Sequence, residues 1–109
     1  MIEQEVMAAL TTVCDNVHAI FMPNDATFPS ITYQVVFDGT EQGVAGCVSG
    51  RNTRFQVDIY SKTYGEAKTL KGAAVLKLLE LNAGNISAQD LYEDTIGLYR
   101  QLIDFNIKE

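Results

Sequence analysis

Two carboxylates, Asp58 and Asp104, are the residues of this chain best suited to acid–base chemistry. Each falls on the polar side of a stretch in which polar and apolar residues alternate, so one sheet face could bring them together. Two close carboxylates raise one pKa, which would permit proton transfer. The alternative, which we favour, is that each carboxylate pairs with Arg54 or Arg100 on a neighbouring strand.

The single histidine, His18, gives little support for nucleophilic catalysis. A Ser-His-Asp triad would have to use it, yet it lies among apolar residues and the chain contains no Gly-x-Ser-x-Gly motif. With Cys14 and Cys47 far apart, the residue counts also argue against a histidine-rich zinc site and a disulfide framework. Cys14 falls near an apolar helical stripe and is interpreted as a small buried hydrophobe. We therefore predict no enzyme, no catalytic residue, no metal site and no cofactor.

Two other clusters lack the patterns of ion-binding sites. Asp90, Glu93 and Asp94 do not match a calcium-binding loop and are interpreted as a solvated rim. Four glycines flank and interrupt Thr40–Gly50, but no phosphate-binding motif follows a strand. Ordering a glycine-dense segment costs much conformational entropy, so Thr40–Gly50 is predicted to be mobile, as a loop or loose hairpin tip.

Composition indicates one small acidic domain that spans residues 1–109. The chain has 109 residues, of which 47% are hydrophobic, and a formal net charge of −6. This size and hydrophobic content allow a single core. The acidic balance argues against a dedicated DNA-binding surface, because nucleic-acid affinity comes largely from Lys and Arg. No apolar run is long enough to span a membrane, and the acidic N-terminus is unlike a secretory signal, so a cytoplasmic location is expected.

The clearest elements are a two-faced strand and the amphipathic helix that follows it. In Arg51–Ser61, apolar Phe55, Val57 and Ile59 alternate with polar residues. Thr63 and Glu66 have the spacing of a capping box, which predicts a helix over Thr63–Leu81. Its apolar stripe consists of Ala67, Leu70, Ala74, Leu78 and Leu81, widened by Val75 and Leu79.

The rest of the chain predicts a further helix and further strands. A helix of about fourteen residues begins near Ile2 and ends at Asp15–Asn16. The other expected elements are a short edge strand (Val17–Phe21), a loop (Met22–Pro29), strands (Ile31–Asp38, Ile86–Glu93 and Leu98–Ile107) and a turn (Asp94–Gly97). This order is typical of an α+β fold, with a mainly antiparallel β-sheet of four to five strands and two helices packed on one face.

The polar strand sides and the glycine-rich segment are the candidate partner interface. Arginine and tyrosine are common in protein–protein interfaces, although an ordinary wet sheet surface explains the same pattern equally well. The candidate interface residues are Thr40, Glu41, Gln42, Gly43, Arg51, Arg54, Gln56, Tyr60 and Arg100.

Several motifs are similar to those of one family. The series Arg54–Ser61 followed by Thr63–Ala67 resembles a hallmark of the tail terminator, or tail-completion, proteins of tailed phages and prophages. Gly97–Arg100 with Leu102–Phe105 resembles the closing strand of that family. Pro29–Tyr33 resembles its first sheet strand, which follows a proline-bearing loop. The resemblance covers nearly the whole chain.

The resemblance implies a structural protein of the virion. Such a protein forms a ring of copies of itself, usually a hexamer, that caps the head-proximal end of the tail tube. It ends polymerisation of the tube protein and offers the joining surface to a head connector or neck protein. It assembles in the bacterial cytoplasm and remains in the virion tail.

A ring of this kind needs two unlike patches on each copy, and strand edges with Thr40–Gly50 are candidates. An acidic ring would not grip the phosphates of passing DNA. The alternative from another class is a small-molecule-binding or enzymatic α+β domain, with Asp58, Asp104 and Tyr60 on a polar sheet face.

Overall fold

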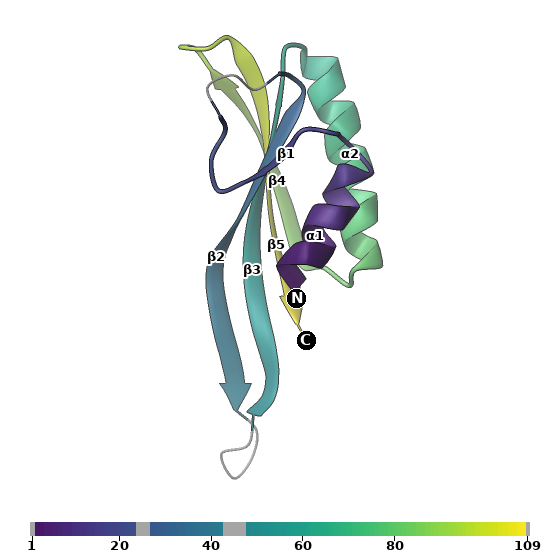
Figure 1. Ribbon diagram of the computed structural model, residues 1–109, viewed down its shortest axis with the longest axis vertical. Coiled ribbons are helices and arrows are strands. Elements are labelled where there is room, and N and C mark those ends of the chain that lie inside the picture. The colour runs from purple at the N-terminus through teal and green to yellow at the C-terminus, as the bar shows by residue number, and fades with distance from the viewer. Residues whose placement is uncertain (1, 24–26, 43–47, 109) are drawn as a thin grey trace.

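One five-stranded sheet, with two helices on one of its faces, makes up the fold (Figure 1). The computed structural model describes residues 2–23, 27–42 and 48–108, and of residues 37–42 and 48–51 it describes the backbone alone. The elements are α1 (Ile2–Thr11), β1 (Val17–Ala19), β2 (Ser30–Gln42), β3 (Val48–Ser61), α2 (Tyr64–Glu80), β4 (Gly84–Glu93) and β5 (Leu98–Lys108).

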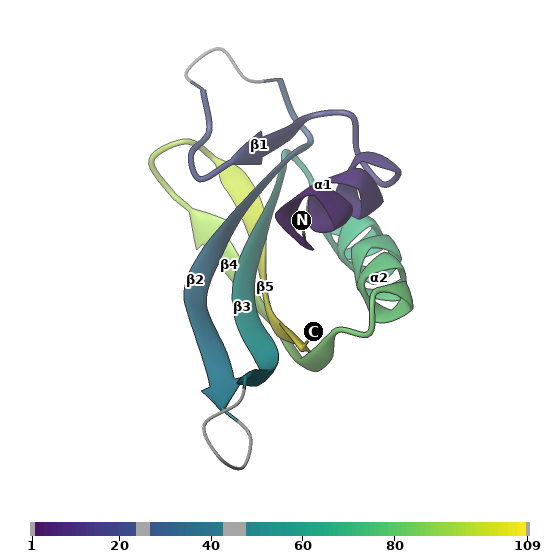
Figure 2. The ribbon, with the colours of Figure 1, turned by 60° about the horizontal axis from the view of Figure 1, so that its bottom comes forward.

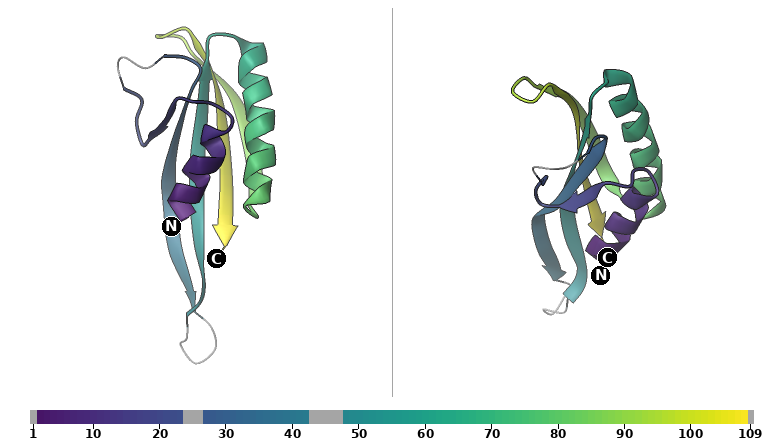
Figure 3. Two further views of the ribbon diagram at one scale, coloured as in Figure 1. Left: turned by 45° about the vertical axis from the view of Figure 1, so that its right-hand side comes forward. Right: turned by 45° about the horizontal axis from the view of Figure 1, so that its top comes forward.

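The strand order is β1-β2-β3-β5-β4, with β1 parallel to β2 and every other pair antiparallel. Both helices lie on the same side of the sheet, as Figure 3 shows from two further directions. The predicted α+β class, with a mainly antiparallel sheet and helices on one face, is therefore confirmed.

The core lies between the helices and the apolar side of the sheet. Phe55, Val57 and Ile59 of β3 are fully buried there, as the alternation predicts. Phe55 stacks on Phe105 of β5 with ring centroids 5.3 Å apart. The helices contribute Ile2, Val6 and Leu10 from α1 and Ala74 and Leu78 from α2. Leu79 is an exception to the predicted stripe, since it points away from the core and is exposed.

The start of α2 follows the predicted cap with one difference. The Thr63 hydroxyl accepts a hydrogen bond from the Glu66 backbone N–H at 3.3 Å, as expected for an N-cap. The Glu66 carboxylate, however, accepts from the Ser61 hydroxyl at 2.5 Å, and the Thr63 N–H donates to that same hydroxyl at 3.3 Å. Ser61 thus stands between the two members of the predicted capping box.

The end of α2 is closed by residues that tolerate the left-handed conformation. Asn82 has a positive φ of 63° and donates its N–H to the Leu79 carbonyl, while the Ala83 N–H donates to the Leu78 carbonyl. These two bonds form a Schellman motif, which satisfies carbonyls that the helix leaves unpaired. The motif turns the chain directly into β4.

Two elements are shorter than the sequence predicts. The first helix ends at Thr11, where the Thr11 and Thr12 hydroxyls donate to the carbonyls of Met7 and Ala9 and so compete with helix continuation. Strand β1 ends at Ala19, because Ile20 has a φ of +73° and the Phe21 N–H donates to the Ala19 carbonyl at 2.8 Å. This bond closes a tight γ-turn that an extended strand cannot contain.

The β2–β3 hairpin is longer than predicted. Thr40–Gln42 and Val48–Gly50 are strand rather than loop, while the predicted mobile tip at residues 43–47 lies outside the described residues. Beyond the Asn52–Lys108 pair, β2 and β3 pair only with each other among the described strands. Figure 2 shows this two-stranded arm reaching past the C-terminal end of β5. It contributes to an elongated shape with extents of 53 × 25 × 22 Å.

Candidate functional site

The side of the sheet opposite the helices carries a connected set of polar side chains. Alternation in β3 sends Arg54, Gln56 and Asp58 to this side, because Phe55 and Val57 occupy the other. The antiparallel register then aligns each of them with residues of β2 and β5 that share the same side. We call this set the polar face, and it consists of Thr32, Gln34, Arg54, Gln56, Asp58, Tyr60, Arg100 and Asp104.

The centre of the polar face is an ion-pair network around Asp58. Arg100 donates from Nε to Asp58 Oδ1 at 2.9 Å and from Nη1 to Glu93 Oε1 at 2.8 Å. Gln56 donates from Nε2 to the other Asp58 oxygen at 3.1 Å. The Asp58 side chain is only 9% exposed and that of Arg100 22%. The network therefore links β3, β4 and β5 in one fixed arrangement.

The network also affects the ionisation of its members. Burial acts to lower the pKa of Arg100, but its hydrogen bonds to Asp58 and Glu93 outweigh burial and raise that pKa. Burial raises the pKa of Tyr60, whose ring lies 5.6 Å from the Arg100 guanidinium carbon. Arg100 consequently stays charged and Tyr60 stays a neutral hydroxyl at neutral pH.

A second ion pair lies farther along the same face. Arg54 donates from Nε to Asp104 Oδ1 at 2.9 Å and makes a second bond from Nη2 to Asp104 Oδ2. This pairing raises the pKa of Arg54 and lowers the pKa of Asp104. Asp58 and Asp104 are thus each bound by an arginine, which confirms the cross-strand alternative over a carboxylate pair that shares a proton.

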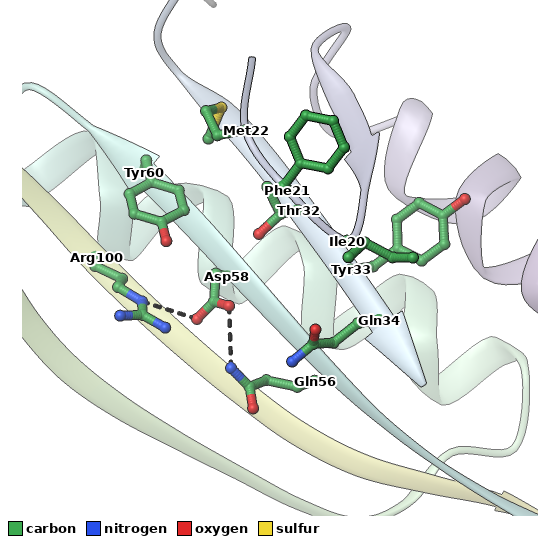
Figure 4. A pocket seen from close by; sticks show the side chains of 10 residues that line it. All are labelled: Ile20, Phe21, Met22, Thr32, Tyr33, Gln34, Gln56, Asp58, Tyr60 and Arg100. Carbon is green, nitrogen blue, oxygen red and sulfur yellow. Dashed lines mark hydrogen bonds and ion pairs between the residues drawn. The ribbon is translucent and has the colours of Figure 1, made fainter. Parts of the chain in front are cut away.

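A cavity of about 230 Å³ opens above this network. Figure 4 shows Arg100 and Gln56 both directed at Asp58, with Phe21 and Met22 on a separate segment beside Thr32. Polar groups supply most of the lining, whereas a small-molecule site is usually apolar with few polar groups. The lining residues are Ile20, Phe21, Met22, Thr32, Tyr33, Gln34, Gln56, Asp58, Tyr60 and Arg100.

The structure brings together part of the predicted interface. Arg54, Gln56, Tyr60 and Arg100 share the polar face. Thr40, Glu41, Gln42 and Arg51 belong to the arm, where Thr40 pairs with Arg51, and Gly43 lies outside the described residues.

Thr32, Gln34 and Glu93 belong to this site but were not among the predicted site residues. The alternation of the second strand contained the signal for Thr32 and Gln34, since it puts both on the polar side. Ile20–Met22 was not singled out either, because Ile20 and Phe21 were assigned to the predicted edge strand and Met22 to the loop that follows it.

The acidic cluster is more than the predicted solvated rim. Glu93 pairs with Arg100, and Asp90 accepts from the Tyr64 hydroxyl at 2.8 Å and from Lys68 Nζ at 3.2 Å. The Tyr64 hydrogen bond is the main reason that the pKa of Asp90 is lowered. Within the described part of the chain, no three His, Cys, Asp or Glu side chains gather as a metal site.

The remaining candidates for chemistry have structural surroundings. His18 is half-buried in β1 and pairs with Thr32 through the strand register. Cys14 is buried, as predicted, and burial raises the pKa of its thiol. Cys47 lies outside the described residues. No helix in the described ranges has the length and apolar character needed to cross a membrane.

Comparison with known proteins agrees with the sequence resemblance. The family model described as tail completion protein gp17 matches residues 3–108. A chain from the structure of the virion of a native gene transfer agent particle has the same fold, with a TM-score of 0.57 and 12% sequence identity. The alignment covers 98% of this chain and 90% of that one. No curated protein matches.

Proposed function

This chain belongs to the family of tail completion protein gp17, and we propose that it caps the head-proximal end of a phage tail tube. As a member of that family it is a structural protein of the phage tail. The family match over residues 3–108 is the observation that carries the proposal. In this role the protein ends polymerisation of the tube protein and forms the surface to which the head connector or neck protein joins.

The protein acts as a ring of copies, of which a hexamer is the expected form. The arm supports contact with a neighbour, because a two-stranded ribbon is marginally stable by itself in water. Thr40, Glu41 and Gln42 of β2 pair only with the facing end of β3 among the described strands. Packing against a second protein would supply the neighbours that the arm lacks.

The polar face supports contact with the tube or the connector. Its arginines are already held by carboxylates in the isolated chain, so little side-chain entropy is lost when a partner binds. Tyr60 and Gln56 offer further hydrogen-bonding groups beside them. A face that is ordered in advance suits a docking surface that meets the same partner in every virion.

Nucleic acid is not the proposed partner. The net charge is −6, and Arg54 and Arg100 bind Asp104 and Asp58 instead of standing free for phosphates. DNA can therefore pass such a ring without being gripped. Assembly takes place in the host cytoplasm, and the protein then stays in the virion tail.

Tail morphology tests this function. We expect that particles made without this protein carry tubes of uncontrolled length, and that the wild-type chain restores a defined length in electron micrographs. Tails of normal length that fail to join heads would instead indicate a head–tail joining protein. Normal tails and normal joining without the chain would contradict both roles.

A matched pair of variants tests the polar face. Gln34→Arg places a bulky charge beside the Asp58 network, while Thr69→Arg places the same charge on an exposed position of α2. We expect Gln34→Arg to fold, as shown by its melting temperature, and to lose the ability to restore defined tails. Thr69→Arg should restore them. Equal activity of the two variants would exclude the polar face as a contact.

A further inference from the structure

Among the described residues, most of the exposed large apolar side chains lie in two patches at opposite ends of the strand order. The first patch, at the β1–β2 edge, consists of Ile20, Phe21 and Val35. The second, at the β4 edge, consists of Tyr64, Tyr92 and Ile96. A monomeric protein has no reason to concentrate its exposed apolar surface at two such places.

The first patch is presented by a strained turn. Ile20 has a φ of +73°, a conformation that is costly for a β-branched residue, and the γ-turn around it leaves Ile20 and Phe21 each 72% exposed. Ile20 and Val35 also line one groove of about 350 Å³ beside β2. In the isolated chain, no burial of Ile20 and Phe21 compensates for the conformational cost of this turn. Burial of these side chains against a partner would compensate for it.

The second patch is an ordered aromatic platform. The Tyr99 ring packs against two others, with its centroid 4.9 Å from that of Tyr92 and 5.8 Å from that of Tyr64. The Tyr64 hydroxyl also donates a hydrogen bond to Asp90. Tyr92 and Ile96 nevertheless remain more than half exposed. Rigid tyrosines that bury large areas at small entropic cost are typical of protein interfaces.

Both patches adjoin strand edges that no described strand covers. Beyond Tyr33, the outer edge of β2 has no neighbour, and the outer edge of β4 has none along its length. In β4, residues 84–89 carry no charge, although charged side chains are a common protection of exposed edges. Free edges of this kind accept strands from another chain.

We propose that the first patch of one copy binds the second patch of the next copy, with the two sheet edges side by side. Because every copy carries both unlike patches, the contact repeats head to tail and can close into a ring. This assignment rests on the ring proposed above and names the surfaces that build it. In a two-fold dimer, both patches would instead be used between the same two copies, and assembly would stop at the dimer.

Cross-linking between single cysteines tests the pairing directly. Ala19→Cys and Thr95→Cys, at exposed positions that adjoin the two patches and leave their apolar side chains in place, are made in a Cys47→Ser background, while buried Cys14 stays in place. With a short bismaleimide we expect cross-linked dimers when the two proteins are mixed with or without tail tubes, and none from either protein alone. The chain carrying both substitutions should give a ladder of cross-linked oligomers on a denaturing gel. Its largest species should contain as many copies as the ring. Cross-links between copies of either protein alone would overturn the head-to-tail assignment.

Variants of the strained turn give an independent test. Ile20→Gly removes apolar surface and relieves the positive φ, so its melting temperature should not fall, whereas the concentration needed for half-assembly should rise at least tenfold. Phe21→Ser should act in the same direction. Leu76→Ser is the matched control, because Leu76 is 67% exposed on α2 outside both patches. It should assemble like the wild type.

The outcomes separate this inference from the function on which it rests. A wild-type ring that forms on tails while Ile20→Gly and Phe21→Ser assemble normally would overturn the patch assignment and leave the capping role intact. A wild-type chain that stays monomeric by light scattering, both alone and with tail tubes, would overturn the ring and this inference together.

Discussion

The two sides of strand β3 are stabilised by different means. Phe55 and Val57 are fully buried against the helices, whereas Arg54 and Asp58 on the opposite side are held by charged partners on β5. One alternating pattern therefore encodes a stabilising face and a face available for contact. The difference teaches that order on the polar face comes from ion pairs rather than from a covering layer, so it can remain open to a partner.

Truncating a buried side chain on the helix side of β3 should have the largest effect on stability. Phe55→Ala removes a ring that stacks on Phe105 and has no exposed surface. We expect a loss of about 3–5 kcal/mol in the free energy of unfolding, measured with urea, because the cavity cannot fully close. The exposed Leu76→Ala should change stability by no more than about 0.5 kcal/mol. Similar losses in both variants would refute a core on the helix side.

On the polar face, removal of Arg100 is the strongest test. Arg100→Met leaves the nearly buried Asp58 without its charged partner and leaves Glu93 unpaired. Allowing for solvent screening of a partly exposed network, we expect a loss of about 1–2 kcal/mol in the free energy of unfolding. Arg54→Met should cost less, because Arg54 is 54% exposed. If Arg54→Met were the more damaging, the network would not order this face.

Patterns among residues close in the sequence account for much of what was predicted correctly. Alternation placed Phe55, Val57 and Ile59 inside, and residue types at fixed spacings located the cap at Thr63 and the end of α2. These signals depend on neighbours within a few residues. They were sufficient for the fold class and for the division of β3 into two sides.

Features that depend on tertiary contacts could not be predicted in the same way. Which arginine binds Asp58 depends on the register between β3 and β5, and alternation alone fits either partner. The role of Ser61 between Thr63 and Glu66 requires the end of β3 to lie over the start of α2. The γ-turn at Ile20 contradicts the preference of a β-branched residue, so no propensity rule indicates it.

Removing the N-cap of α2 should have a smaller effect on stability. Thr63→Ala removes the hydroxyl that accepts the Glu66 N–H at the start of α2. We expect a loss of about 1 kcal/mol in unfolding free energy by urea denaturation, and Thr63→Ser should retain most of the stability. Thr69→Ala, inside the helix, is the control and should cost less. An unchanged Thr63→Ala variant would mean that packing alone sets the start of α2.

The smallest effect, and the sharpest test of the polar face, is the pH dependence of the Arg54–Asp104 pair. The pairing lowers the pKa of Asp104 in the folded chain below the unfolded value of about 3.9. The folded state therefore binds this proton more weakly than the unfolded state. The stabilising contribution is complete above the unfolded pKa and is lost as the pH falls through the folded one.

A double-mutant cycle with Arg54→Gln and Asp104→Asn isolates this contribution from other titrating groups. We expect a favourable coupling at pH 7 that weakens in high salt, because the Arg54 side chain is more than half exposed and its charge is therefore screened. The coupling should disappear as acid protonates Asp104. A coupling that stayed constant down to pH 2 would show that hydrogen-bond geometry, rather than charge, joins β3 to β5 at this position. Order on the polar face would then not depend on ionisation, and the contrast with the buried side would be weaker.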